Sequence, residues 1–549
     1  MRAGGRISLA GPLSYPRPLA MLLALVASAL LAPAVLARGV SRDTSTEWLS
    51  ATGAQEKAAD DAKKVSNGEA QDDEKKEKKA DHSVTQHSIA IDGTQLDYTA
   101  RAGRMTLEDE QGKAKAEIFF VAYTKNGAGD GESEPAKRPI TFSFNGGPGS
   151  SSVWLHLGAL GPQRVKMAPE GWALPPPYEL VENNHSWLDL TDLVFIDPVT
   201  TGYSRAAEGE DSAQFHGVTQ DVEWVGEFIR LYTTRYERWA SPKFLAGESY
   251  GTTRAAALAG HLQDRHGMYL NGIVLVSAIL NFQTARFDVG NDLPYALFLP
   301  TYAATAWYHE RVAPDLRGDL RTMLDEVERF AIDEYLPALA KGDALGRDER
   351  ERLATRLSRY TGLSRDYVDR ANLRIEIGRF TKELLREERR TVGRLDSRFE
   401  GIDLDASGER YEYDPSYAAI QGPFTGALND YVRRTLRYEN DLPYEILTGR
   451  VHPWKYDQQN RYLNVGETLR QAITHNPALR VLVAAGYFDF ATPYFAAEYT
   501  LRHLGLDPSL QKNVTIAHFQ AGHMMYIHEG ELARFKQEVA RFVRAATAR

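Results

Sequence analysis

The chain has 549 residues and a formal net charge of −9, with 43% hydrophobic and 25% charged residues. This composition is typical of a large globular protein and excludes wholly disordered, collagenous and many-spanning membrane chains. The acidic balance argues against nucleic-acid binding, which favours a basic face. The absence of cysteine excludes disulfides, thiolate metal sites and a cysteine nucleophile.

The first 37 residues have the features of an export signal. Arg2, Arg6 and Arg17 precede an apolar run that begins at Leu19, and small residues with A-x-A spacing follow it. We expect residues 1–37 to be a signal peptide, removed when the protein is secreted or delivered to the periplasm, so that no membrane span remains. An uncleaved membrane anchor is the alternative, because an apolar run of about 19 residues is near the lower limit for spanning a bilayer.

A charged segment separates this signal from the folded part of the chain. Charged side chains dominate residues 56–81, where Val65 is the only sizeable apolar side chain. Such a segment cannot bury enough surface to offset its ordering entropy. We therefore expect residues 38–84 to be a disordered linker and residues 85–549 to form the folded part.

Alternating apolar and polar residues predict a β-hairpin at the start of the folded part. The two strands cover 88–91 and 95–99, and the Asp92-Gly93 pair between them is typical of a tight hairpin turn. A third strand is predicted over 116–123, before a glycine-rich turn at 127–131.

Five short apolar runs, separated by helical patterns, predict the central sheet. They cover 140–144, 193–196, 244–246, 273–277 and 479–484. Runs of this kind are typical of parallel strands buried on both faces. Their alternation with helices predicts an α/β fold with a mostly parallel sheet, whose ligand crevice lies beyond the carboxyl ends of the strands.

A serine flanked by glycines follows one of these runs. Residues 247–251 read G-E-S-Y-G, directly after the strand at 244–246 and before a helix-favouring stretch at 252–263. In a G-x-S-x-G motif the serine occupies a strained turn, and the glycines allow neighbouring backbone to pass closely. We therefore predict that Ser249 is a nucleophile. A purely structural glycine-flanked turn is the alternative.

The base and the acid that such a serine requires are found near the end of the chain. Asp489 and His523 each lie in a glycine-containing turn directly after a predicted strand. The chain order Ser249, Asp489, His523 is the α/β-hydrolase order and excludes the chymotrypsin-like and subtilisin-like orders. His528 is a competing base that we expect inside the following helix. His518, at a strand end, is expected to be structural.

A glycine-rich loop after the strand at 140–144 is the predicted oxyanion hole. Residues 145–149 read N-G-G-P-G, and glycine lets this backbone approach a reacting carbonyl. The predicted donors are the backbone N–H groups of Gly147 and Tyr250, the latter immediately after the nucleophile. A phosphate-binding loop is excluded, because no Lys-Ser or Lys-Thr pair follows.

Taken together, these motifs resemble those of the serine carboxypeptidase family of α/β-hydrolases. The matching blocks are 145–152 (NGGPGSSS), 195–204 (FIDPVTTGYS), 247–251 (GESYG) and 521–524 (AGHM), with 486–489 supplying the acid. The resemblance covers roughly 139–282 and 479–545. It implies an α/β-hydrolase fold and the removal of C-terminal amino acids from peptides with a free C-terminus, with no metal or other cofactor.

The same resemblance implies how the terminal carboxylate of the substrate is held. Carried over, the binding groups are the Asn145 side chain, the Gly146 N–H and the Glu248 carboxyl. A carboxyl group can donate a hydrogen bond to a carboxylate only when it is protonated. We therefore expect activity on peptides to be favoured in acid.

Three departures from the family pattern leave exopeptidase specificity more open than serine hydrolysis. The family's second glutamate, which shares a proton with the first, is replaced by Ala159 here. The D-Q-P block is one residue shorter at Asp197-Pro198, and Ser150 stands in place of a cysteine. An esterase or acyltransferase of the same fold therefore remains an alternative, as does a prolyl aminopeptidase. A non-catalytic binding scaffold is the alternative of a different class.

The long stretch between the fourth strand of the sheet and the acid predicts an inserted helical cap at about 283–450. Apolar residues recur on one helical face within 319–340, where Pro337 should kink or end the helix. A second helix is predicted after Arg347. The folded part, 85–549, is thus predicted to be one hydrolase unit with a cap, of unknown oligomeric state.

Overall fold

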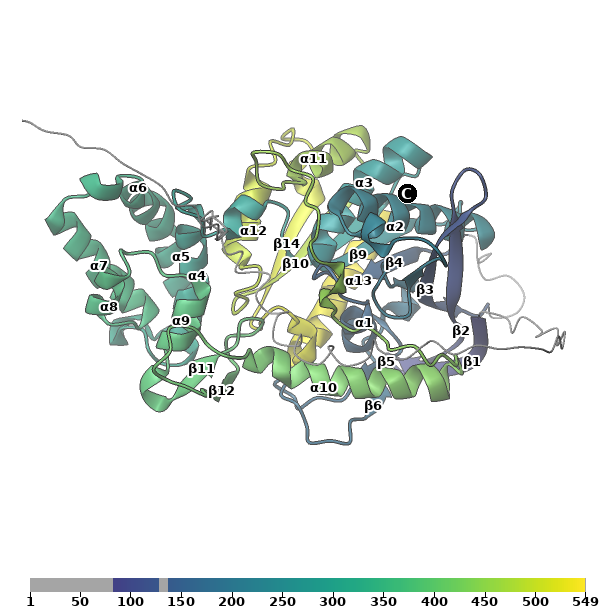
Figure 1. The fold of residues 1–549 in the computed structure, drawn as a ribbon, viewed down its shortest axis with the longest axis horizontal. Helices are drawn as coiled ribbons and strands as arrows, with labels where there is room; N and C mark the ends of the chain where they lie inside the picture. The colour runs from purple at the N-terminus through teal and green to yellow at the C-terminus, as the bar shows by residue number, and fades with distance from the viewer. Residues whose placement is uncertain (1–81, 128–136, 549) are drawn as a thin grey trace, which may run out of the picture. The chain divides into compact units, whose positions relative to one another are not determined.

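The computed structural model describes residues 82–127 and 137–548 (Figure 1). The predicted signal peptide at 1–37, all but the end of the predicted linker at 38–84, and most of the glycine-rich turn at 127–131 lie outside the described residues. All described residues fall within one compact unit of the chain, Asp43–Arg549.

Ten strands form one sheet with the order β1-β2-β3-β7-β4-β9-β10-β13-β14, and β8 (Arg205–Ala206) pairs with β3. The six strands from β7 to β14 run parallel to their neighbours. They are β7 (Asp192–Ile196), β4 (Ile140–Phe144), β9 (Lys243–Ser249), β10 (Gly272–Ala278), β13 (Arg480–Gly486) and β14 (Val514–Phe519). Most of their residues are buried, which explains why they are near-continuous apolar runs in the sequence. The predicted parallel strands are confirmed.

The N-terminal strands extend this sheet with antiparallel pairing. They are β1 (His82–Ile91), β2 (Thr94–Glu108) and β3 (Ala114–Lys125), and β3 pairs with β7. The turn between β1 and β2 has φ of 48° at Asp92 and 75° at Gly93, as a tight two-residue hairpin turn requires. The predicted hairpin is confirmed, with strands longer than the alternation alone indicated.

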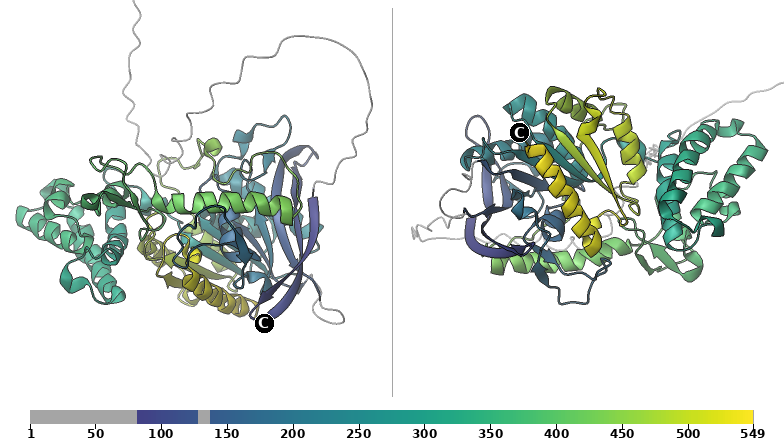
Figure 2. Two further views of the ribbon diagram at one scale, coloured as in Figure 1. Left: turned by 90° about the horizontal axis from the view of Figure 1, so that it is seen from below. Right: turned by 180° about the vertical axis from the view of Figure 1, so that it is seen from behind.

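Different helices cover the two faces of the sheet (Figure 2). Phe535 and Phe542 of the last helix pack with Phe244 of β9, whereas the next residue, Leu245, packs with Phe228 and Leu258 on the opposite face. Successive strand residues point to opposite faces, so one strand contributes to both cores. The flanking helices are α2 (Val218–Arg235), α3 (Tyr250–His266), α11 (Gly466–His475), α12 (Tyr494–Arg502) and α13 (Glu529–Thr547).

A helical insertion lies between β10 and β13, where the cap is predicted. Its helices are α4 (Leu293–Tyr308), α5 (Leu320–Phe330), α6 (Leu336–Leu339), α7 (Arg347–Thr361), α8 (Arg365–Arg370), α9 (Ile377–Glu383) and α10 (Pro415–Asp430). The first six share a core of their own, which Phe488 and Phe490 join, whereas Phe424 of α10 packs into the core of the sheet. A short hairpin, β11 (Arg390–Val392) and β12 (Glu400–Ile402), lies between the two parts.

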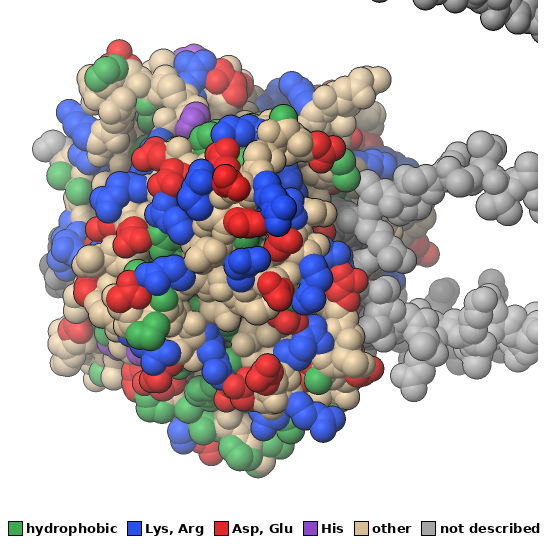
Figure 3. Space-filling model, turned by 90° about the vertical axis from the view of Figure 1, so that its left-hand side faces the viewer, with side chains coloured by type: hydrophobic (Ala, Val, Ile, Leu, Met, Phe, Trp, Pro, Cys, Tyr) green, Lys and Arg blue, Asp and Glu red, His purple; other side chains and the backbone are tan. Residues whose placement is uncertain are grey.

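The predicted helix at 319–340 continues through a π-helical turn. This turn covers Ala331–Tyr335, directly before α6, and Pro337 lies in the first turn of α6, which ends at Leu339. The helix predicted after Arg347 is α7. On the outer face of the insertion, basic and acidic side chains are interspersed (Figure 3). Exposed ion pairs of this kind contribute about 0 to 1 kcal/mol each.

No helix within the described residues has both the length and the apolar character that crossing a membrane would require.

Candidate active site

Ser249 lies at the sharp junction between β9 and α3. Its backbone has φ of 59° and ψ of −128°, a strained conformation for a residue with a side chain that costs about 1 to 3 kcal/mol. A Cβ atom at Gly251 would lie 2.8 Å from the Phe144 carbonyl oxygen, and one at Gly247 would lie 2.2 Å from the Gly251 carbonyl oxygen. Glycine is therefore required at both flanking positions, and the predicted strand, turn and helix are confirmed.

The N-G-G-P-G loop packs directly against the start of α3. A Cβ atom at Gly146 would lie 2.4 Å from the Tyr250 nitrogen, and Gly147 adopts φ of 102°. The segment after α10 also holds this loop, since the Thr448 N–H donates to the Gly149 carbonyl at 2.9 Å. The first backbone N–H groups of a helix have no partner within it, and the helix dipole favours negative charge there. The structure thus brings the loop carrying Gly147 to the N-terminus of the helix that starts at Tyr250.

Asp489 and His523 form a buried pair beyond the ends of β13 and β14. The Nδ1 atom of His523 lies 2.7 Å from Oδ2 of Asp489. The same carboxylate accepts the Ala491 N–H at 2.7 Å, the Thr492 N–H at 3.0 Å and the Thr492 hydroxyl at 2.7 Å. The carboxylate orientation is therefore fixed by four donors. Burial opposes protonation of His523, but the Asp489 carboxylate outweighs it and raises the pKa of His523 above its usual value.

Ser249 and His523 come from adjacent parts of the sheet. Ser249 pairs with Ala278 on β10, and the hydroxyl of Ser277 on β10 donates to the His523 carbonyl at 2.6 Å. The Ser249 hydroxyl has no hydrogen bond to another described residue.

Glu248, the residue directly before Ser249, carries a buried carboxyl group. Its side chain is 3% exposed, and burial raises its pKa to about 7. Three groups oppose that shift: the charge of His523, the Tyr526 hydroxyl and the Asn145 side chain, whereas Asp489 adds to it. The Tyr526 hydroxyl donates to Oε2 of Glu248.

Asn145 presents a donor beside Glu248. Its Oδ1 atom accepts the Leu155 N–H at 3.1 Å, which orients the amide group. Its Nδ2 atom is buried and close enough to Glu248 to lower the pKa of that carboxyl, but forms no well-aligned hydrogen bond with a described residue. A buried N–H group without a partner is costly, so this donor is suited to an acceptor on a ligand.

Two groups near the site were missed from the sequence. Tyr526 lies three positions after His523, and no spacing rule marks it. The other is the loop 394–398 of the insertion, which joins the turns that carry Asp489 and His523. Its hydrogen bonds run from His523 N–H to Leu395 O (2.6 Å), from Gly522 N–H to Asp396 Oδ2 (3.0 Å), from Phe490 N–H to Arg394 O (3.0 Å) and from Ser397 N–H to Phe488 O (3.0 Å).

The remaining histidines near this end of the chain have other partners. His518 pairs with Glu498 at 2.8 Å. The prediction that His528 lies inside the last helix was wrong: it is the N-cap residue of α13, whose Nδ1 atom accepts the Glu531 N–H while Nε2 contacts Glu170 at 3.0 Å. An unprotonated ring nitrogen can accept this hydrogen bond from the first turn of the helix while the residue itself lies just outside the helix, as N-cap residues do.

Comparisons with known proteins identify the family of the chain. The family model for serine carboxypeptidases matches residues 93–542. The chain belongs to the serine carboxypeptidase family. The match includes the insertion, where the sequence offered no motif.

Individual relatives match over shorter regions. Carboxypeptidase Y of Schizosaccharomyces pombe is 31% identical over 212 residues, which are 38% of this chain and 18% of that protein. Serine carboxypeptidase-like 45 of Arabidopsis thaliana is 27% identical over 269 residues, which are 44% of this chain and 54% of that protein. The chain therefore spans about half or less of the length of these relatives.

Among solved structures, the prohormone-processing carboxypeptidase Kex1 from Saccharomyces cerevisiae has the same fold. The TM-score is 0.50 at 16% sequence identity, with 81% of this chain and 91% of that chain covered. This likeness confirms the predicted α/β-hydrolase fold.

Proposed function

We propose that the protein is a serine-type carboxypeptidase that hydrolyses the C-terminal peptide bond of peptides with a free C-terminus. The observation that carries this proposal is a buried carboxyl at Glu248, directly before Ser249 in the chain, with the amide donor of Asn145 beside that carboxyl. Such a pair can bind a terminal carboxylate next to the nucleophile, which an esterase or a lipase has no need to do.

The proposed chemistry is acyl transfer to water. His523 accepts the proton of the Ser249 hydroxyl, Ser249 attacks the scissile carbonyl, and Asp489 stabilises the imidazolium that forms. The N–H groups of Gly147 and Tyr250 stabilise the oxyanion, and each such donor contributes about 2.7 to 4 kcal/mol to transition-state stabilisation. His523 then protonates the leaving amine, and water hydrolyses the acyl-enzyme by the reverse sequence.

The substrate carboxylate would be held by the Asn145 amide, the Gly146 N–H and a protonated Glu248. Glu248 is the residue directly before Ser249, and in this proposal the bound carboxylate lies one residue away from the scissile carbonyl. This spacing favours removal of one amino acid at a time. The pKa of Glu248, about 7, would make this binding mode available in acid and lose it as the pH rises above that value.

An esterase or acyltransferase of the same fold is the second candidate. The observation that favours it is the fully buried Ala159, which supplies no second carboxyl to the site. We further propose that the protein acts in the periplasm or outside the cell, on the basis of the predicted signal at residues 1–37, which lies outside the described residues.

Product analysis on paired peptides tests the proposal. Each peptide is supplied with a free and with an amidated C-terminus, and products are identified by mass spectrometry. We expect release of single C-terminal residues from the free form only, with Ser249→Ala inactive and no longer labelled by a fluorophosphonate. Cleavage from the N-terminus, or turnover restricted to small esters, would contradict the proposal.

A further inference from the structure

Tyr526 places a hydroxyl against the carboxyl of Glu248. Tyr526 lies in the short 3₁₀ turn Met525–Ile527, between His523 and α13, and its hydroxyl donates to Oε2 of Glu248. The exposed fractions are 1% for Tyr526 and 3% for Glu248. In a site with so little water, a hydrogen bond between the two side chains fixes the carboxyl group far more firmly than it would at the surface.

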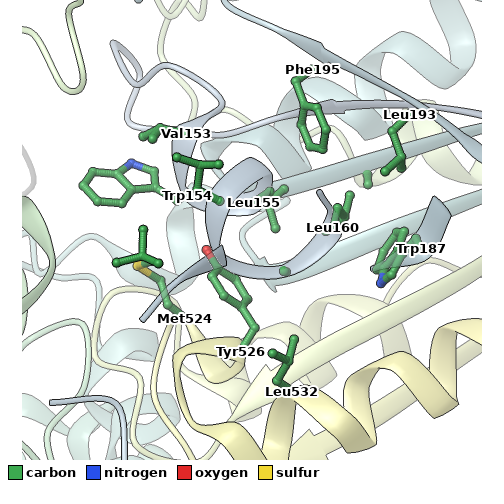
Figure 4. Packing of buried hydrophobic residues seen from close by; sticks show 14 of the residues in the cluster. Val153, Trp154, Leu155, Leu160, Trp187, Leu193, Phe195, Met524, Tyr526 and Leu532 are labelled. Atoms are coloured by element: carbon green, nitrogen blue, oxygen red, sulfur yellow. The ribbon is translucent and has the colours of Figure 1, made fainter. Parts of the chain in front are cut away.

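The residue that faces the Tyr526 ring is a glycine, Gly158, which leaves room for the ring. A Cβ atom at Gly158 would lie 2.4 Å from Cε2 and 2.8 Å from Cδ2 of Tyr526. Gly158 and Ala159 are neighbours in the π-helical turn His156–Leu160. Figure 4 shows the Tyr526 ring pointing toward this segment, with its hydroxyl at the far end. The ring therefore fits only because the facing residue has no side chain.

A phenol and a carboxyl make different partners for Glu248. Burial raises the pKa of Tyr526 well above its ordinary value, so its hydroxyl remains protonated throughout the range in which Glu248 titrates. In the structure this hydroxyl donates to Oε2 of Glu248, and while it does so the proton of a neutral Glu248 resides on Oε1. A second carboxyl, by contrast, would itself gain and lose a proton near the pH at which Glu248 does.

We propose that Tyr526 is the positioning residue of the substrate-carboxylate site: its hydroxyl holds Glu248 so that Oε1 presents the proton to the terminal carboxylate of a peptide. The Tyr526 hydroxyl thus gives Glu248 a hydrogen-bond partner, which Ala159, at the position of the family's second glutamate, cannot provide. This inference rests on the proposed function, because it assigns how the same site recognises its substrate.

The test is Tyr526→Phe, which keeps the ring and removes only the hydroxyl. Two substrates with the same acyl group are compared, an N-blocked dipeptide with a free carboxylate and an ester without one. We expect KM for the dipeptide to rise about tenfold, because a misplaced Glu248 makes a weaker hydrogen bond to the charged carboxylate of the substrate, while kcat on the ester stays within about twofold. Tyr302→Phe is the matched control, since its buried hydroxyl donates to the Ile375 carbonyl within the insertion; it should change neither value.

The pH dependence separates positioning from a loss of packing. The groups that face Glu248 are Asn145 from the first loop, Asp489 from the turn after β13, and His523 and Tyr526 from the turns after β14. Removing the Tyr526 hydroxyl removes a donor to the ionised form of Glu248. The alkaline rise in KM for the dipeptide should therefore move to higher pH in Tyr526→Phe. In a Glu248→Ala background, Tyr526→Phe should raise KM no further.

Three results would overturn the inference. The first is an unchanged KM for the dipeptide, and the second is an equal loss of activity on the dipeptide and the ester. The third is a rise in KM for the dipeptide on adding Tyr526→Phe to Glu248→Ala that is as large as in the wild type. If the wild-type enzyme itself fails to release C-terminal residues, the proposed function is wrong; if it releases them and one of these three results is obtained, only the role of Tyr526 is wrong.

Discussion

If the proposed function is right, the protonation of Glu248 should govern how strongly the protein discriminates peptides from esters. Its pKa of about 7 means that nearly every molecule carries the proton at pH 5 but only about one in eleven does at pH 8. If the protonated form binds the substrate carboxylate, kcat/KM for a free-carboxylate dipeptide should fall about tenfold between these pH values through Glu248 alone.

A ratio of substrates isolates this effect from the titration of His523. Both the dipeptide and an ester without a carboxylate require neutral His523, so its ionisation cancels when kcat/KM for the dipeptide is divided by kcat/KM for the ester. We expect this ratio to fall about tenfold from pH 5 to pH 8 in the wild type, with an inflection near 7. In Glu248→Gln, whose amide donates at every pH, the ratio should be flat.

Glu208→Gln is the matched control, because Glu208 is an exposed carboxyl and its replacement should leave the wild-type profile intact. A flat ratio in the wild type would refute the role of Glu248 as a proton donor to the substrate. An unchanged fall in Glu248→Gln would show that another group titrates.

Further substitutions test other parts of the site. Asp489→Asn should lower kcat by about 10⁴ while the circular dichroism spectrum is unchanged, because the carboxylate fixes the tautomer of His523; a loss below tenfold would argue against the assignment. Asp396→Asn weakens the buried ion pair with Arg398 and the hydrogen bond from the Gly522 N–H, and should lower the free energy of unfolding in urea by about 3 kcal/mol. Arg347→Ala, which removes an exposed ion pair, should lower it by less than about 1 kcal/mol. Equal effects of the two substitutions would contradict the reasoning. Gly158→Ala should displace the Tyr526 ring and raise KM for peptides, while Gly318→Ala, where a Cβ meets nothing within 4 Å, should be silent in the same assay.

The insertion contacts the candidate site in a way that a simple cap would not. Through its loop 394–398 it accepts hydrogen bonds from the turns that carry Asp489 and His523. The segment that follows α10 holds the glycine loop through Thr448. Removal of the insertion would therefore leave these turns without the partners that orient them, in addition to opening the crevice.

What the sequence determined by itself is local or repeats along the chain. Strands buried on both faces need continuous apolar runs, so the central sheet could be predicted from such runs alone. The turn at Ser249 needs glycine on both sides, because backbone atoms lie within 3 Å of where a Cβ atom would stand at Gly247 and Gly251. This requirement is visible in the sequence as the motif G-E-S-Y-G. The places of Asp489 and His523 followed from the rule that polar chemistry gathers beyond the carboxyl ends of parallel strands.

Only the tertiary structure decided which side chains meet across long stretches of chain. Tyr526 and Glu248 are 278 positions apart, and their contact depends on the absence of a side chain at Gly158, a third distant point. The loop 394–398 reaches His523 because the insertion packs against Phe488 and Phe490. No periodicity or fixed spacing in the sequence marks either contact, because each depends on how segments distant in the chain fill the same buried space.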